Sequence, residues 1–358
     1  MEEALKSKQH IGRIILRLLL RLLAFALSTL AVLAVLVLCA ILIICRGGSD
    51  SARDTFVRSV KETSAVGFLA DLFLSSSEVE AILNPPVETL AEKTDASLVA
   101  VARPEELGGP EPDAWGYVDE DGDGLILVPI KGGSYTGFML IVLDPSRVVV
   151  GCHPGSFGGR GYTVAEFAEE ANAAAAINAG GFEDEGGMGN GSFPDTLVVS
   201  GGEIYCSSLG LGSGFAGLDA DHVLHVGIRT LAELREARIQ EGCGFVHGPV
   251  LVVNGEIASG GYLFSGLNPR TAIGQRSDGA ILLLVLDGRQ PSKLGASYLD
   301  EAELMLRFGA VNASNLDGGS SSLMWFNGSY VNENASLIGI RPVPTAFLVL
   351  QEGRDPDA

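Results

Sequence analysis

Hydrophobic residues are unevenly distributed along the chain, and the first feature they define is an apolar run near the N-terminus. Residues 22–45 carry no charge, and a helix of about 20 residues crosses the hydrocarbon core of a bilayer. We therefore predict a transmembrane anchor over 22–45. A cleaved signal peptide is the alternative. Its apolar region would be about 7–15 residues long and would end in small residues, whereas this run ends in Ile-Ile-Cys-Arg.

The residues before this run predict its orientation. Positive charge accumulates on the cytoplasmic side of membrane helices, and five basic residues precede the run: Lys6, Lys8, Arg13, Arg17 and Arg21. Residues 1–21 are accordingly predicted to be a cytoplasmic tail, and the chain after Arg46 to be extracytoplasmic. The predicted location is the cell membrane, crossed once, with the bilayer as a partner of the N-terminal helix.

The next segment, 46–83, has the pattern of a helix. Phe68, Leu69, Leu72 and Phe73 fall on one helical face, and Asn84-Pro85-Pro86 ends the pattern. We predict a helix over 50–83 that serves as a stalk or a docking helix, and we assign no chemistry to it. Residues 84–124 are acidic and rich in proline and glycine, which predicts a solvated linker.

From residue 125 the chain alternates short β-branched runs with glycines, which predicts strands. Capping signals predict three helices that begin after Thr163, Thr230 and Ser297, the last of them ending at Gly309. Strands outnumber helices and do not alternate regularly with them. The predicted class is therefore α+β, with a bent mixed β-sheet and a few flanking helices over 125–352, followed by a tail at 353–358.

Charge and composition exclude two classes of protein. Asp and Glu number 44 against 24 Lys and Arg, so the formal net charge is −20. Binding to nucleic acid requires a cationic face, so we expect no nucleic-acid partner. Hydrophobic residues make up 47% of the chain, which is enough to build a core and excludes general disorder.

One acidic segment is similar to half of a calcium-binding loop. Asp119, Asp121 and Asp123 have the spacing of the first ligands of an EF-hand, but the twelfth position, which requires a bidentate acid, is Ile130. The residues that follow form a predicted strand instead of a helix. We interpret the segment as an acidic turn before a strand. No cofactor is predicted, and calcium is the divalent ion that this segment would suit.

Polar residues at strand ends beside glycines are the candidates for chemistry. A carboxylate at the end of a buried strand is costly unless it is paired or used, and adjacent glycines let backbone amides converge on an anion. Carboxylates mixed with arginines in an acidic protein favour a site for an anionic, hydroxylated substrate. The residues concerned are Asn178, Arg270, Asp287, Arg289, Asn315, Asp317 and Arg341.

The segments around these residues resemble the phosphodiester glycosidase family, whose animal member uncovers mannose 6-phosphate by removing N-acetylglucosamine. The resemblance extends from about Gly132 to Val349, and its specific blocks are INAGGF, NPRTAIG, LLLVLDGR, NLDGGSSS and RPVPTAFLV. The anchored architecture is similar to bacterial relatives that are often described as exopolysaccharide biosynthesis proteins. Two positions depart from the family pattern. Ser320 replaces the third glycine after the Asp of the fourth block, and Leu323 replaces a small polar residue.

The resemblance implies a membrane-anchored hydrolase that cleaves the C1–O bond of a sugar-1-phosphodiester in cell-envelope or exopolysaccharide metabolism. Asp317 would then be the nucleophile or base at C1, and Asp287 the partner acid or an orienting group. Arg270 and Arg289 would hold the phosphate by charge-assisted hydrogen bonds. The alternative for Asp287 is an ion pair with Arg289 that fixes the loop.

The remaining candidates are expected to bind substrate. Asn178 and the segment Gly318, Gly319, Ser320 and Ser321 would contact sugar hydroxyls or the phosphate, and His247 would line the same cleft. No residue is predicted to be a metal ligand of this site. A second hypothesis keeps the cleft but not the catalysis, as a glycan-binding module anchored at the cell surface. The sequence identifies no protein partner, and the expected ligand is a glycan or a sugar phosphodiester.

Overall fold

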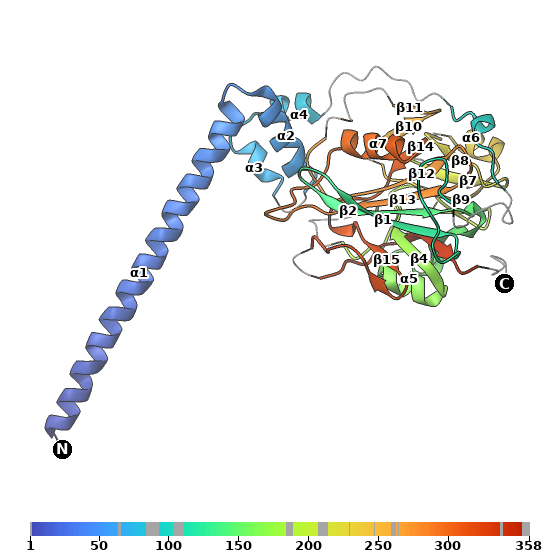
Figure 1. Ribbon diagram of the computed structural model, residues 1–358. Helices are drawn as coiled ribbons and strands as arrows, with labels where there is room; N and C mark the ends of the chain where they lie inside the picture. Colours follow the sequence, from blue (N-terminus) through green and yellow to red (C-terminus); the bar gives the residue numbers. More distant parts are fainter. Residues whose placement is uncertain are drawn as a thin grey trace.

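The computed structural model describes residues 2–63, 66–83, 93–102, 111–183, 189–206, 214–228, 230–246, 248–258, 263, 265–336 and 339–352. Within these ranges the chain forms a long N-terminal helix, a small cluster of short helices, and a larger domain of β-sheets with three helices (Figure 1). The predicted α+β class is confirmed.

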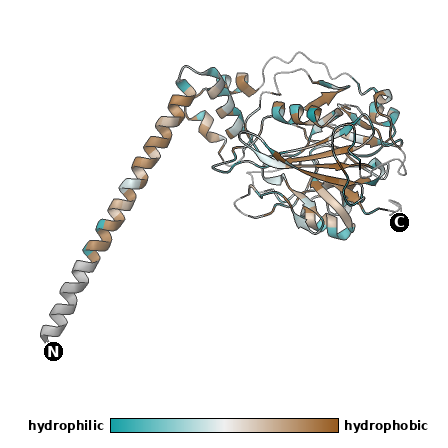
Figure 2. Ribbon diagram, viewed as in Figure 1, coloured by the Kyte–Doolittle hydropathy of each residue, from teal (hydrophilic) through white to brown (hydrophobic). Residues whose placement is uncertain are grey.

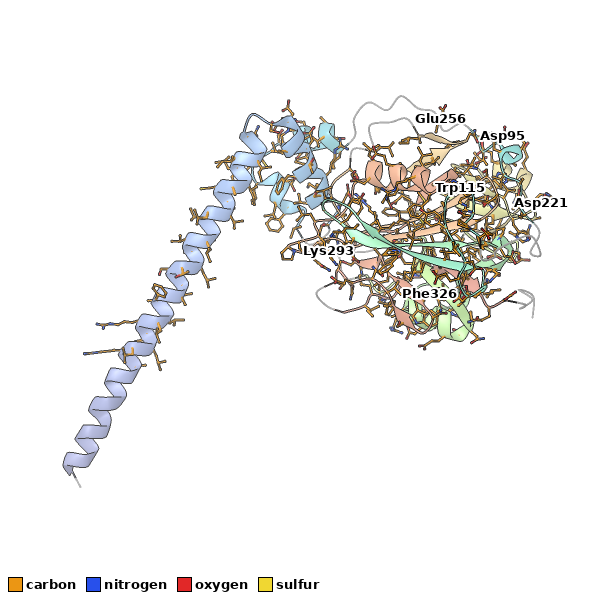
Figure 3. The ribbon with its side chains drawn as sticks, viewed as in Figure 1. Asp95, Trp115, Asp221, Glu256, Lys293 and Phe326 are labelled. Carbon is orange, nitrogen blue, oxygen red and sulfur yellow. The ribbon has the colours of Figure 1, made fainter. Side chains whose placement is uncertain are left out.

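The N-terminal helix α1 (Glu2–Arg46) projects away from the rest of the molecule (Figure 1). Its section Leu16–Arg46 is long and apolar enough to cross a membrane, and most of its large apolar side chains are exposed. Figure 2 shows the hydrophobic colouring continuing along this section, and Figure 3 shows its side chains projecting away from the helix. A helix over the predicted span is therefore confirmed. A signal sequence near an N-terminus has the same length and composition.

The region predicted as one helix over 50–83 is divided into three: α2 (Asp50–Lys61), α3 (Phe68–Asp71) and α4 (Ser76–Leu83). A capping box that the sequence analysis missed explains where α4 starts. The Glu78 amide donates to Ser75 Oγ at 3.3 Å, and the Ser75 amide donates to the Glu78 carboxylate at 2.7 Å. The prediction of a continuous helix is therefore wrong. The three helices share a small apolar core with the end of α1.

Three sheets build the larger domain. In the first, the order is β1-β2-β13-β12-β14-β10-β11; in the second, β16-β15-β4-β17-β3; in the third, β6-β5-β9-β7-β8. Every strand pair in the described part of the chain is antiparallel. The structure thus differs from the single mixed sheet that we predicted. Short connections and hairpins, such as the turn at 277–279, join neighbouring strands in opposite directions.

The strands have the following bounds: β1 Leu125–Lys131, β2 Thr136–Val142, β3 Val148–Cys152, β4 Ala173–Asn178, β5 Val198–Ser200, β6 Glu203–Tyr205, β7 Ala216–Asp219, β8 Leu224–Val226, β9 Ile239–Cys243, β10 Val250–Val253, β11 Glu256–Ile257, β12 Arg270–Arg276, β13 Ile281–Leu286, β14 Ala310–Asn315, β15 Met324–Phe326, β16 Ser329–Tyr330 and β17 Thr345–Leu350.

The three predicted helices of this domain are present as α5 (Val164–Glu170), α6 (Leu231–Glu236) and α7 (Tyr298–Arg307). Each begins with a capping box, formed at Thr163, Thr230 and Ser297 respectively. The capping predictions are confirmed. Gly309 follows α7 at φ 90°, a left-handed conformation that glycine adopts without strain.

Successive side chains of the central strands point to opposite faces of the first sheet, and each face is covered by a hydrophobic cluster. In β2, Leu140 and Val142 face a cluster shared with the second and third sheets, whereas Met139 and Ile141 face a cluster shared with α7. Helix α5 covers the second sheet through a further cluster. Figure 1 shows α7 and α5 on opposite sides of the strands. Both faces of β12 and β13 are thus buried, which holds their ends rigidly.

The acidic segment before β1 forms a turn, as we interpreted it. The Asp119 carboxylate accepts hydrogen bonds from the backbone amides of Gly122 and Gly124, at 3.1 and 3.0 Å, and β1 follows directly. Carboxylate oxygens of Asp119, Asp121 and Asp123 lie within 4.8 Å of one another. Part of the segment predicted as a solvated linker also packs on the domain: Asp113 pairs with the buried Arg276 at 2.7 Å.

Helix α2 is docked on the sheet domain by the Ser59 hydroxyl, which accepts from the Leu267 amide at 2.9 Å, and above all by one carboxylate. Glu62, directly after α2, accepts from Arg270 Nη2 and Asn268 Nδ2, both at 2.8 Å, and from the Gly266 amide at 3.0 Å. The Arg270 side chain is 4% exposed and that of Glu62 26%. A charge that is buried this deeply requires a partner. Glu62 therefore connects helix α2 to the end of β12.

We expect Glu62→Gln to lower the free energy of unfolding by about 2 kcal/mol, because it leaves the buried Arg270 guanidinium without its carboxylate. Urea denaturation of the detergent-solubilised chain measures this. Glu80→Gln is the matched control, since Glu80 is exposed on α4. Equal stability of the two variants would show that the pair does not dock α2.

Candidate functional site

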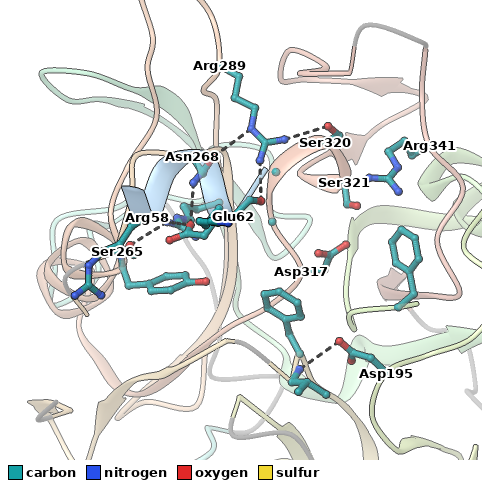
Figure 4. A pocket seen from close by; sticks show the side chains of 18 of the residues that line it. Arg58, Glu62, Asp195, Ser265, Asn268, Arg289, Asp317, Ser320, Ser321 and Arg341 are labelled. Atoms are coloured by element: carbon teal, nitrogen blue, oxygen red, sulfur yellow. Dashed lines mark hydrogen bonds and ion pairs between the residues drawn. The ribbon is translucent and has the colours of Figure 1, made fainter. Parts of the chain in front are cut away.

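A pocket of about 920 Å³ lies between the end of α2 and the ends of several strands (Figure 4). Its volume is within the range of small-molecule sites. Although the protein is strongly acidic, cations outnumber carboxylates in the lining, by five to four. The cations are Arg58, Lys61, Arg270, Arg289 and Arg341, and the carboxylates are Glu62, Glu183, Asp195 and Asp317. This balance favours an anionic ligand.

Asp317 enters the pocket from the loop after β14, and buried hydrogen bonds fix this loop. The Asp317 amide donates to Ala179 O at 2.9 Å, and Asn178 Nδ2 donates to Asp317 O at 2.6 Å. Asn178 Oδ1 in turn accepts from Thr271 Oγ1 at 2.9 Å and from the Leu323 amide at 3.1 Å. Asn178 is fully buried and is absent from the lining that the structure describes. It therefore positions Asp317 instead of contacting a ligand.

The glycines after Asp317 permit a close approach of Arg289. Gly319 has φ 62°, and a Cβ added there would lie 3.0 Å from Arg289 Nη2. Ser320, at the position where the family pattern has a third glycine, uses its hydroxyl to accept from Arg289 Nη1 at 3.3 Å. Gly318, Gly319, Ser320 and Ser321 all line the pocket. The other departure, Leu323, is buried in the apolar cluster beside α5.

Arg289 forms no ion pair with any of the described residues. Its guanidinium donates to neutral oxygens: Asn268 Oδ1 at 3.1 Å, Ser320 Oγ at 3.3 Å and Glu62 O at 3.3 Å. Burial and, after it, the charge of Arg270 lower the pKa of Arg289 to about 10. Its backbone is left-handed, at φ 56°, which is uncommon outside glycine and frequent at functional sites.

Arg270, by contrast, is saturated by protein groups. It pairs with Glu62, donates to Ala296 O at 2.9 Å and to Gly266 O at 2.7 Å, and lies 3.9 Å from the Tyr298 ring centroid. Burial lowers its pKa, but Glu62, Tyr298 and Glu301 together more than offset this, and the net pKa lies above the usual range. We expected both arginines to hold the phosphate. Arg270 is already paired with Glu62, whereas Arg289 forms no ion pair with a described residue.

Asp195 is a pocket carboxylate that the sequence analysis missed. Its Oδ2 accepts a long hydrogen bond from the Val246 amide, at 3.4 Å, and its buried Oδ1 has no hydrogen-bond partner in the described part of the chain. Burial, and after it the charge of Asp317, raise the pKa of Asp195 to about 7. Asp195 follows Pro194 in a loop, and the only signal in the sequence was a charge directly before the apolar run TLVV.

Asp287, which we expected to act with Asp317, does not belong to the pocket lining in the described chain. It is buried and accepts from Thr136 Oγ1 at 2.8 Å, Asn332 Nδ2 at 3.2 Å and the Glu333 amide at 3.1 Å. Its ion-pair partner is Lys293, at 3.4 Å, so the alternative pairing with Arg289 does not occur. This network fixes the ends of β2 and β13. His247 lies outside the described residues.

The short helices after α1 contribute to the pocket, which we did not expect. Arg58, Lys61 and Glu62 line it from α2 and its C-terminal end. Arg58 Nε is buried, with no hydrogen-bond partner in the portion described. Arg341 lines the pocket from a different side and lies 5.1 Å from the ring centroid of Phe182. No motif within 50–83 indicates that this segment reaches the strand ends.

Comparison with known proteins identifies the class to which this fold and pocket correspond. Residues 171–350 match the family model described as phosphodiester glycosidase. This range covers half of the chain and includes Asn178, Asp195, Arg289 and Asp317. The chain belongs to the phosphodiester glycosidase family.

Its relatives include N-acetylglucosamine-1-phosphodiester alpha-N-acetylglucosaminidases. The chain is 30% identical to the Bos taurus enzyme over 208 residues, which are 52% of this chain and 38% of the relative. It is 27% identical to the Mus musculus enzyme over 278 residues, 71% of this chain and 52% of the relative. The chain thus spans about half or less of the length of these relatives.

A solved structure confirms the fold. The catalytic domain of the zebrafish N-acetylglucosamine-1-phosphodiester alpha-N-acetylglucosaminidase, described as auto-inhibited by its pro-peptide, superimposes with a TM-score of 0.52. The match covers 64% of this chain and 82% of the zebrafish chain at 22% identity. At this identity, the similarity supports a shared fold and no more.

The raised pKa of Asp195 predicts a pH dependence of stability. Its pKa in the unfolded chain is about 3.9, so the folded protein binds this proton more tightly and the unfolding free energy falls as pH rises from about 4 to about 7. Asp195→Asn removes this dependence. We expect the variant to gain more stability relative to wild type at pH 8 than at pH 5.

Urea denaturation at the two pH values measures this difference. Glu203→Gln, an exposed carboxylate on β6, is the control and should shift both values equally. A change for Asp195→Asn that is the same at pH 5 and pH 8 would show that its carboxyl titrates in the ordinary range.

Proposed function

We propose that this protein is an enzyme that hydrolyses the C1–O bond of a sugar-1-phosphodiester and releases a phosphomonoester. The observation that carries the proposal is the Arg289 guanidinium, which is held beside the Asp317 loop without a carboxylate partner in the described chain. Such a cation is stabilised by a ligand that supplies the missing negative charge. A phosphodiester does so and matches the planar donors of arginine.

The proposed chemistry needs little acid catalysis. A phosphomonoester has a second pKa of about 6, so the departing phosphate is a good leaving group without protonation. Arg289 would hold the phosphate, and the amides of Gly318 and Ser320 and the hydroxyls of Ser320 and Ser321 would contact its oxygens. Arg270, which is already paired with Glu62, would hold Asn268 and Glu62 in place instead of binding substrate directly.

Asp317 would act at the sugar. It lies next to the Gly-Gly-Ser segment and so would face C1 when the phosphate is bound at Arg289. A carboxylate there stabilises the positive charge that develops on the ring as the C1–O bond breaks. Asp287 would not take part in the reaction, and it would maintain the loops through its hydrogen bonds to Thr136 and Asn332.

The setting of the reaction is also a proposal. The apolar section of α1 and the basic residues before it support a single membrane span with a cytoplasmic N-terminus. The pocket would then be extracytoplasmic and tethered near the membrane by α2–α4. Sugar phosphodiesters of the cell envelope, including those of exopolysaccharide metabolism, are the substrates accessible in that location. The names of the relatives support N-acetylglucosamine as a sugar to test first.

Asp317→Asn should lower kcat for N-acetylglucosamine 1-(methyl phosphate) by at least about a thousandfold, because the neutral amide cannot stabilise the developing charge. Released methyl phosphate measures turnover, and circular dichroism verifies the fold. The non-catalytic glycan-binding module is the competing outcome: it predicts that wild-type protein binds the diester and releases no methyl phosphate. Turnover by Asp317→Asn at the wild-type rate would remove Asp317 from the mechanism.

Arg289→Gln should raise KM for the same diester by about 10- to 100-fold, since it removes a charge-assisted contact to the phosphate. Binding of N-acetylglucosamine itself should be unchanged, because this sugar carries no phosphate. Arg235→Gln, on the surface helix α6, is the matched control. An equal loss of affinity for the free sugar and the diester would contradict the phosphate assignment.

A further inference from the structure

We propose that Asp195 is the general base that removes a proton from the attacking water. This inference rests on the proposed hydrolysis and assigns a role to a carboxylate in the same pocket. Once the phosphate leaves as its anion, the water supplies the only proton that the reaction must move. The pocket therefore needs one proton acceptor on the sugar side, in addition to its phosphate-binding cation.

The placement of Asp195 fits the sugar side. Figure 4 shows Asp317 between Asp195 and Arg289. The charge of Asp317 acts on both of them, which agrees with its central position. A substrate with its phosphate at Arg289 and C1 at Asp317 would therefore present the opposite face of the sugar to Asp195. A water on that face is aligned for attack opposite to the leaving group.

The backbone of Asp195 is fixed, whereas its carboxylate is left available. Its amide donates to Gly181 O at 2.9 Å, and the adjacent pair Phe182 and Pro194 forms a β-bridge. A side chain at position 181 would collide with the Asp195 carboxylate, so glycine there leaves room for it. The buried Oδ1 atom has no hydrogen-bond partner in the described chain. A buried carboxylate oxygen in this state is costly unless water or substrate donates to it.

The two carboxylates also differ in their surroundings. Arg289 lies on the side of Asp317 that faces away from Asp195 (Figure 4). Asp195 is farther from this cation, and burial raises its pKa to about 7. A base is most effective when its pKa lies near the working pH, because it is then both ionised and strongly proton-accepting. Asp195, with its pKa of about 7, meets this condition.

The proposed step balances without any co-reactant. One O–H bond of water breaks and its proton goes to Asp195, while the water oxygen forms a bond to C1. The C1–O bond to the phosphate breaks, and its electron pair remains on the phosphate oxygen held at Arg289. The products are the free sugar, a phosphomonoester and protonated Asp195, which returns its proton to solvent. Attack opposite the phosphate inverts the configuration at C1.

The test uses Asp195→Asn in the full, detergent-solubilised chain with N-acetylglucosamine 1-(methyl phosphate) as the probe. We expect methyl phosphate release to fall by 100- to 10,000-fold, and the acidic limb of the kcat/KM profile of wild type, near pH 7, to disappear. Sodium azide should restore release in this variant, because azide attacks without losing a proton. Nuclear magnetic resonance should then identify the glycosyl azide of inverted configuration. Glu203→Gln is the control. Its rate of methyl phosphate release and its pH profile should equal those of wild type, and azide should not raise its rate.

Several outcomes would overturn the proposal while leaving the hydrolytic function intact. These are wild-type turnover by Asp195→Asn, reduced turnover that azide does not restore in a folded variant, or a first sugar product of retained configuration from wild type. The last measurement needs no variant, so it decides the point even if Asp195→Asn does not fold. Absence of methyl phosphate release by wild-type protein would instead overturn the proposed function, and the role of Asp195 with it.

Discussion

An arginine that forms no ion pair in the described part of the chain is the feature on which the site depends. Arg289 is held in a left-handed backbone conformation and donates to a side-chain amide oxygen, a hydroxyl and a carbonyl. Repulsion by the neighbouring Arg270 adds to the cost of its burial and is reflected in its lowered pKa. A protein of net charge −20 has abundant carboxylates that could pair with it. Arg289 nevertheless has no ion-pair partner in the described chain, although the Asp317 loop lies next to it. This lack of a partner favours an anionic substrate.

The fold holds this arrangement in place by rigidity at the strand ends. The central strands β12 and β13 are buried on both faces, and β4 and β14 deliver Asn178 and the Asp317 loop to the same end of the domain. Asn178 contacts three different segments through one side chain, so the loop cannot move without breaking buried hydrogen bonds. Glu62 extends the same network to α2. The short helices after α1 are therefore part of the pocket wall as well as a connection to α1.

Local patterns in the sequence predicted local structure well. Capping boxes located α5, α6 and α7, and β-branched runs located most strands of the domain. The same approach predicted one helix where three occur, because the Ser75–Glu78 cap was not weighed against the apolar periodicity. Pairing direction was also misjudged, since strand composition does not specify which strands become neighbours. Arg270, Arg289 and Asp317 were singled out because charges at strand ends beside glycines are costly without a partner.

The remaining parts of the site depend on contacts between distant segments. Glu62 lies 208 residues before Arg270, and nothing near Glu62 in the sequence indicates this pairing. Asp195 lies in a loop, where a carboxylate is ordinary, and its burial follows from the packing of residues 181 and 245–246 against it. Asp287 was a candidate because of its position after a strand, and the family resemblance implied a role as partner acid or orienting group. Its contacts with Thr136, Asn332 and Lys293 link distant segments, so the sequence alone did not indicate them.

The most direct test of the central claim is a crystal structure of the Asp317→Asn variant with N-acetylglucosamine 1-(methyl phosphate) bound. We expect phosphate oxygens within hydrogen-bond distance of the Arg289 guanidinium, with C1 of the sugar next to residue 317. A phosphate bound elsewhere, with Arg289 still donating only to Asn268, Ser320 and the Glu62 carbonyl, would contradict it.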